Sequence, residues 1–216
     1  MFTKLLEKVL THVTYIILIK KFEGVENLPK EKAFIVAANH TSYVDIWALL
    51  LVFYMKKKRY VRFIAKKELV QDWYVQLLQK LFLKPENKPI FFDKKTPREE
   101  LFKKSLSALK RGHIVGIFPE GIRSSDGKIQ KGKTGTARLA LMAKVPIVPV
   151  GITGAFELMP TSKSAPKMKK SVKLKIGKPI YTNNYKKRKI TKKLLREITD
   201  KIMKEIAKLS GQKYNP

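Results

Sequence analysis

A histidine and an aspartate, His40 and Asp45, lie five residues apart in a segment that reads Asn-His-Thr-Ser-Tyr-Val-Asp. An imidazole whose orientation is fixed by a carboxylate can accept the proton of a hydroxyl group, which is the role of a general base. The chain has no cysteine and no Gly-x-Ser-x-Gly sequence, so no nucleophile of a familiar kind accompanies the pair. The alternative is that His40 only caps a helix, because short motifs also arise by chance.

The residues around this pair predict how the two side chains meet. A short apolar run at 33–38 is typical of a buried strand, and the apolar stretch at 43–55 predicts a helix. The threonine and serine between them are residue types that begin helices. We therefore expect His40 just before the helix and Asp45 about one turn inside it, close enough for contact.

A second block at 118–124 reads Phe-Pro-Glu-Gly-Ile-Arg-Ser and follows another apolar run at 114–118. The two blocks resemble the motifs NHxxxxD and FPEG(T)RS of the glycerolipid acyltransferases. Other stretches resemble the remaining motifs of that family and stand in the same order: 63–69, 89–94 and 145–150. Five blocks in order are a much stronger indication than any one of them alone.

The resemblance is greatest to the 1-acyl-sn-glycerol-3-phosphate acyltransferases. It implies transfer of a fatty acyl group from acyl-CoA or acyl carrier protein to the sn-2 hydroxyl of lysophosphatidic acid, which gives phosphatidic acid. His40 would be the general base, oriented by Asp45, in a direct attack without an acyl-enzyme. The residues implied to bind the phosphate and glycerol of the acceptor are Lys94, Glu120, Gly121 and Arg123. The resemblance implies no metal and no cofactor besides the acyl donor.

Two positions depart from the motifs of the family. Ile122 stands where the family usually has threonine, and Lys94 replaces an arginine, which keeps the charge but loses the bidentate guanidinium fork. Both departures concern the acceptor more than the reaction. Because the same motifs serve several acceptors, acylation of glycerol 3-phosphate or of another lysophospholipid stays open.

The segment 127–134, Gly-Lys-Ile-Gln-Lys-Gly-Lys-Thr, satisfies the phosphate-loop pattern GxxxxGK[ST]. A nucleotide-binding loop requires a buried strand directly before its first glycine, but Arg-Ser-Ser-Asp stands there and the nearest apolar run ends at Phe118. A P-loop nucleotide-binding protein is the alternative that the pattern alone would indicate. Our expectation is a basic loop beside the second block, in which Lys128, Lys131 and Lys133 could contact phosphates.

The charge of the chain indicates an anionic partner. It has 47 lysines and arginines against 17 acidic residues, a formal net charge of +30. Nucleic acid, an anionic membrane and a phosphorylated substrate would all suit such a surface, but no zinc-finger, RNA-recognition or basic-zipper pattern supports nucleic acid. Without cysteine there is no disulfide or thiolate metal site, and three histidines argue against a His-rich metal site. A non-catalytic protein docked on anionic membranes would explain the charge, but not the two motifs.

Two apolar stretches favour membrane association. The first 17 residues repeat apolar side chains at helical spacing and precede Lys20-Lys21, while Ile46 to Met55 precedes a basic cluster at 56–59. Neither run approaches the ~18 residues that span a bilayer. We expect residues 1–28 to form a membrane-associating helix and linker on an anionic phospholipid surface, with the protein peripheral or monotopic on the cytoplasmic face of the cell membrane. The second stretch could equally pack in the core.

The remaining chain alternates apolar runs with helical patterns, which predicts an α/β domain over 29–216 with a mostly parallel central sheet flanked by helices. Strands are expected at 33–38, 61–65, 90–92, 114–118, 147–151 and 172–176, and helices at 43–55, 69–83, 97–111, 134–143 and 191–209. Prolines at 146 and 149 place the strand at 147–151 at a sheet edge or beside a bulge. The last helix is basic, since residues 161–216 hold 18 lysines and arginines and three acids.

Overall fold

The computed structural model describes residues 12–57, 60–66, 88–93, 95–160, 167, 171–185 and 188–216. Within them the strands are β1 (Ile19–Glu23), β2 (Ile35–Ala38), β3 (Val61–Lys66), β4 (Ile90–Phe92), β5 (Ile114–Ile117), β6 (Ile147–Thr153) and β7 (Val172–Ile176). The helices are α2 (Val44–Lys57), α4 (Arg98–Lys110), α5 (Gly135–Ala143), α6 (Ala155–Leu158) and α7 (Lys192–Ser210), with short 3₁₀ turns at Val25–Asn27 and Asn183–Tyr185.

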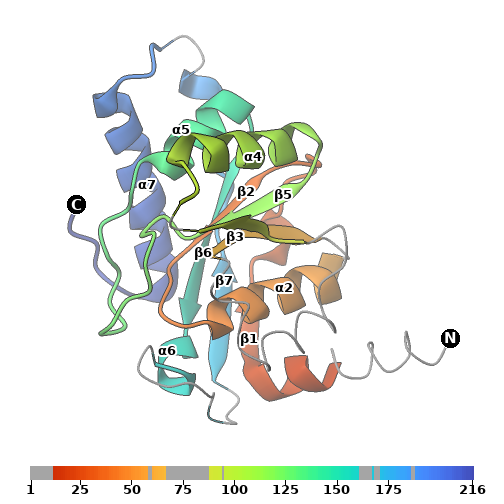
Figure 1. Cartoon of the computed structure of the whole chain (residues 1–216). Coiled ribbons are helices and arrows are strands. Elements are labelled where there is room, and N and C mark those ends of the chain that lie inside the picture. The colour runs from red at the N-terminus through yellow and green to blue at the C-terminus, as the bar shows by residue number, and fades with distance from the viewer. Residues whose placement is uncertain are drawn as a thin grey trace, which may run out of the picture.

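These strands form one sheet in the order β1-β7-β6-β2-β5-β3-β4 (Figure 1). The block from β6 to β4 is parallel throughout. β7 runs antiparallel to β6, and β1 runs parallel to β7. The predicted α/β architecture with a mostly parallel sheet is therefore confirmed.

Helices cover both faces of the sheet. α2 and the first described helical turns lie on one face, whereas α4, α5 and α7 lie on the other (Figure 1). All four residues of β2 are buried, because β2 lies in the middle of the sheet and has helices above and below it. Such burial on both faces explains why β2 is a continuous apolar run rather than an alternating one.

The apolar stretch in α2 belongs to the core. Residues 48–53 are all at most 8% exposed, and all of them except Leu51 pack in the cluster that contains residues of β2 and β7. Their buried environment resolves the question that the sequence left open, since side chains already packed against the sheet are not available to lipid. Among the described residues no helix is long and apolar enough to cross a membrane.

The N-terminal segment differs from its expected course. Residues 12–18 are helical, as predicted, but the chain then enters β1 instead of continuing as helix and linker. The backbone of β1 pairs with the open edge of β7, and Ile19 is only 3% exposed. Pairing with a strand distant in the sequence overrides the local helical pattern here. Residues 1–11, like the helix expected at 69–83, lie outside the described residues.

β6 is an inner strand, so the expectation of a sheet edge was wrong, although the prolines do mark an irregularity. On its antiparallel side β6 pairs with residue 180 through an Ile147–Ile180 bridge and then with β7 from the Val150–Ile176 pair onward, so the ladder is interrupted between them. Pro149 lies in this gap and its carbonyl oxygen accepts a hydrogen bond from the Gly177 N–H at 2.9 Å. A residue without an N–H is tolerated where the ladder is already interrupted.

Candidate active site

The turn after β2 lies in the middle of the sheet at the carboxyl ends of three parallel strands. In open α/β sheets, ligands bind outside the carboxyl ends of the strands. Asn39, the first residue of this turn, is fully buried and exchanges two hydrogen bonds with the backbone of Ile152 in β6, at 2.9 and 2.8 Å. This clamp fixes the backbone immediately before His40.

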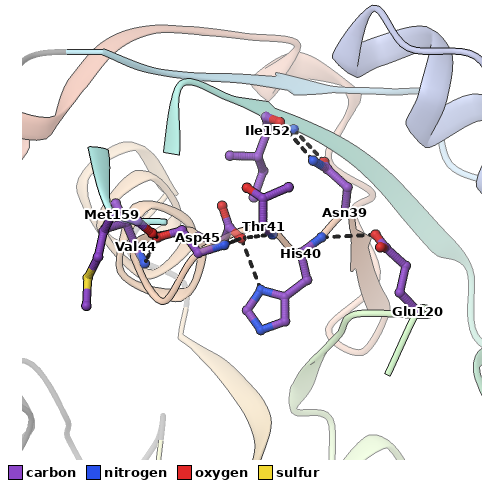
Figure 2. Close-up of polar contacts among 9 residues, drawn as sticks. Asn39, His40, Thr41, Val44, Asp45, Glu120, Ile152 and Met159 are labelled. Carbon is purple, nitrogen blue, oxygen red and sulfur yellow. Dashed lines mark hydrogen bonds and ion pairs between the residues drawn. The ribbon is translucent and has the colours of Figure 1, made fainter. Parts of the chain in front are cut away.

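His40 and Asp45 are in contact, as their spacing predicted. The His40 Nδ1 atom lies 3.0 Å from the Asp45 Oδ2 atom, which also accepts the N–H groups of Thr41 at 2.7 Å and Ser42 at 2.8 Å (Figure 2). Asp45 is fully buried, and the His40 side chain is 13% exposed. Since an ionised carboxylate only accepts, the hydrogen of a neutral ring lies on Nδ1, and the Nε2 lone pair faces away from Asp45.

Two aromatic rings support the other side of the imidazole. The ring of Phe118 stacks on His40 at 3.8 Å and an angle of 11°, and Phe63 stacks behind Phe118 at 5.6 Å. Gly116 makes this stack possible, because a Cβ atom there would lie only 2.3 Å from the Phe63 ring. The imidazole is therefore held by a hydrogen bond at its edge and by packing on its face.

Glu120 lies on the opposite side of the His40 backbone from Asp45 (Figure 2). Its Oε1 atom accepts the N–H of His40 at 3.0 Å, and its Oε2 atom accepts the N–H of Gln130 at 3.1 Å. Glu120 is 2% exposed, and burial raises the pKa of its carboxyl to about 7 against the lowering effect of these two hydrogen bonds. With both oxygens engaged, Glu120 holds two backbone segments together, which the sequence did not predict.

Arg123 lies beside the same turn. The Ser124 N–H donates to the His40 carbonyl oxygen at 2.8 Å, which ties the chain after β5 to the chain after β2. The guanidinium carbon of Arg123 lies 3.6 Å from the centre of the Tyr43 ring, a cation–π contact. None of the ion pairs found within the described ranges involves Arg123. The Tyr43 ring thus holds this charge in position, and among the described residues it has no acidic partner. Sequence reasoning missed the role of Tyr43.

Gly121 turns the chain between Glu120 and Arg123. Its φ angle is 73°, a conformation that favours glycine, and its N–H donates to the Phe118 carbonyl oxygen at 3.0 Å. A Cβ atom at this position would lie 2.8 Å from the Lys133 Nζ atom. Gly121 is therefore needed for the turn and for the close approach of the Lys133 side chain.

The structure places some of the lysines that were predicted to bind phosphate but not all of them. Lys133 approaches Gly121, and Lys128, Lys131 and Lys133 are all exposed on the loop after the second block. Lys94 lies outside the described residues. The loop is not a nucleotide-binding P-loop, because β5 ends at Ile117 and residues 118–134 contain no strand before α5. Within the parts of the chain that the structure describes, no cluster of three or more His, Cys, Asp or Glu residues could hold a metal ion.

Comparison with known sequences agrees with this geometry. A sequence profile of the family described as Acyltransferase matches residues 20–153, a span that contains β2, β5 and both motif-bearing turns. The fold and the site thus define an acyltransferase, and the chain belongs to this family.

Particular relatives can be named. The 1-acyl-sn-glycerol-3-phosphate acyltransferase of Bacillus subtilis is 32% identical over 76% of this chain and 75% of its own length. The chloroplastic enzyme BAT2 of Brassica napus, with the same activity in its name, is 31% identical over 74% of this chain but only 44% of its own. The crystal structure of the 1-acyl-sn-glycerophosphate acyltransferase PlsC of Thermotoga maritima superposes with a TM-score of 0.68 at 29% identity, covering 99% of this chain and 81% of that one.

Proposed function

We propose that this chain transfers a fatty acyl group from an acyl thioester to the sn-2 hydroxyl of lysophosphatidic acid and releases phosphatidic acid. One observation carries the proposal: an oriented His40–Asp45 pair and Arg123, which has no acidic partner among the described residues, lie on adjoining turns at the carboxyl ends of the central strands. A base and an anion-binding cation are two of the groups that acylation of a phosphorylated alcohol requires. The names of the bacterial and plant relatives point to the same acceptor.

The acceptor would be held by its phosphate. Arg123 presents a planar guanidinium that suits a phosphate group, and a guanidinium whose face lies on an aromatic ring can still donate hydrogen bonds from its edge. Lys133 lies next to Gly121 and adds a second positive charge. Lys94 keeps its predicted role in acceptor binding as part of this proposal. The exposed Lys128 and Lys131 keep theirs as contacts for phosphate groups, of a headgroup or of the acyl donor.

Proton transfer would take place at the Nε2 atom of His40. The acceptor hydroxyl donates its proton to Nε2 while its oxygen attacks the thioester carbonyl carbon. Asp45 keeps the hydrogen on Nδ1 and stabilises the imidazolium that forms. When the tetrahedral intermediate collapses, the thiolate leaves and takes the proton from Nε2. Acyl-CoA and acyl carrier protein both supply such a thioester, and no acylated protein occurs on this route.

Glu120 would act through the protein rather than on the substrate. It was expected to bind the acceptor, but its burial and its two bonds to backbone N–H groups favour a positioning role for the turn that carries His40. Glu120 and Arg123, three positions apart in the motif, would then have separate tasks.

We also propose that the enzyme binds peripherally or monotopically to the cytoplasmic face of the cell membrane, on anionic phospholipid. Val13 and Ile16 are 44% and 58% exposed on the N-terminal helix, Ile122 is 58% exposed beside Arg123, and the chain carries a net charge of +30. Shallow apolar insertion combined with electrostatic attraction is typical of interfacial proteins.

Sedimentation with lipid vesicles tests this attachment. Binding to anionic vesicles should weaken between 0.1 and 1 M salt, as the Debye length falls from ~10 to ~3 Å. Replacing Val13 and Ile16 by serine should reduce the salt-resistant binding to neutral vesicles. The matched control is Met142→Ser, which removes an apolar side chain that is 41% exposed on α5. Equal binding of all variants to neutral vesicles at high salt would refute an anchoring role for the N-terminal helix.

A further inference from the structure

The loop that follows the second motif is fastened to the end of α7 by one side chain. The Oε1 atom of Gln212 accepts the N–H of Ile129 at 2.8 Å, and its Nε2 atom donates to the carbonyl oxygen of Gly127 at 3.1 Å. The backbone N–H of Gln212 donates to the Ala207 carbonyl oxygen at 2.9 Å, so the residue is itself fixed to the last turn of α7. A single amide thus spans two backbone groups of a loop more than 80 positions earlier in the chain.

The next residue of the loop leads directly to the candidate active site. Gln130 follows Ile129, and its N–H donates to one carboxylate oxygen of Glu120 at 3.1 Å. The other carboxylate oxygen accepts the N–H of His40 at 3.0 Å. A continuous path of hydrogen bonds and one peptide link therefore connects Gln212 to the backbone of His40.

α7 holds the other end of the same loop. Arg196 donates from Nη1 to the Gly132 carbonyl oxygen at 2.8 Å, and a Cβ atom at Gly132 would lie 2.6 Å from the Met203 side chain. The loop is thus packed closely on α7 at residue 132. At residues 127–129 it instead borders an open hollow of about 560 Å³, which Gln212 and Thr41 also line. Gly127 approaches the Phe156 ring and Ile129 packs against the apolar core, and the Gln212 amide adds the hydrogen bonds that tie this part of the loop to the end of α7.

We propose that Gln212 is a positioning residue for the active site: it fixes the backbone at 127–130, which fixes Glu120, which in turn fixes the backbone of His40. The inference rests on the proposed role of His40 as the base. A base must be aligned closely with the hydroxyl that it deprotonates, and small displacements reduce rates strongly. The task requires a side chain that donates and accepts at once, which glutamine does and which leucine, of similar size, does not.

The first experiment measures hydrogen exchange in the full chain and does not depend on activity. In Q212L the amides of Ile129, Gln130 and His40 should exchange faster than in the wild type, while those inside α7 should not change. The matched control is K213A, which alters an exposed neighbour that lines the same hollow and should leave exchange unchanged. Unchanged exchange at Gln130 and His40 in Q212L would overturn the proposed path.

The second experiment is a double-substitution cycle on acyl transfer. Q212L should lower kcat about tenfold and leave the KM of the acyl donor unchanged, because two hydrogen bonds to the loop are lost while the donor contacts are not. K213A should keep the kcat of the wild type. In an E120Q background Q212L should add less than about a twofold loss, since the path is already cut at Glu120.

The outcomes separate this inference from the proposed function. Independent, additive losses in the cycle would overturn the positioning role, as would faster exchange with an unchanged kcat. A wild-type protein that transfers no acyl group to any acceptor would instead overturn the proposed function, while the exchange measurement would still test the path from Gln212 to His40.

Discussion

Replacing His40 by alanine should lower the kcat of acyl transfer by about 10²–10⁴-fold, the range that general-base catalysis supplies. The substitution removes Nε2, the proposed proton acceptor, and it should leave the fold intact. Asp45 keeps its bonds to the N–H groups of Thr41 and Ser42, and the His40 backbone keeps its bond to Glu120. Steady-state kinetics together with a thermal unfolding curve measure both effects.

The control for this variant is His113→Ala. His113 directly precedes β5, at the end of that strand opposite to the motif that carries Glu120 and Arg123. The H113A variant should therefore keep the kcat of the wild type. An H40A protein that retains more than a tenth of the wild-type kcat, with an unchanged unfolding temperature, would remove His40 from the role of base.

Replacing Arg123 by alanine should raise the KM for lysophosphatidic acid by about 10- to 100-fold and leave the KM for the acyl thioester nearly unchanged. The expected loss corresponds to about 1.5–3 kcal/mol for hydrogen bonds to a charged group. Only the acceptor phosphate is proposed to contact Arg123, which explains why the two substrates should differ. Initial rates with each substrate varied in turn measure the two constants.

Tyr43 provides the matched pair of variants for this test. Y43F keeps the ring that lies 3.6 Å from the Arg123 guanidinium, so it should behave as the wild type. Y43A removes the ring and should raise the KM for lysophosphatidic acid in the same direction as R123A, by a smaller factor. Equal increases in both KM values for R123A would instead indicate that Arg123 supports the fold.

The parts of the site that the sequence predicted are local. His40 and Asp45 meet across one turn, so a spacing of five residues and a helix start between them were sufficient. The turn at Gly121 was likewise contained in a short motif. The inner strands β2, β5 and β6 were predictable because each is a short apolar run, the pattern that burial on both faces requires.

The parts that the sequence did not predict depend on contacts between distant segments. Glu120 was expected to bind the acceptor. Instead its two carboxylate oxygens accept the N–H groups of His40, 80 positions earlier, and of Gln130, 10 positions later. Gln212 has no local signature at all, because the loop that it holds lies at 127–129. β1 was missed for a similar reason: its pairing partner, β7, begins at residue 172.

The most direct test of the proposed function is product analysis by mass spectrometry. Purified full-length protein would be incubated with acyl-CoA or acyl carrier protein thioester and, in parallel, with lysophosphatidic acid, glycerol 3-phosphate or another lysophospholipid. We expect phosphatidic acid from lysophosphatidic acid as the main product, at least about a hundredfold less of it in the same time with H40A, and no acylated protein when the donor is present alone. Preferred acylation of a different acceptor, or a protein whose mass increases by one acyl group, would contradict the account.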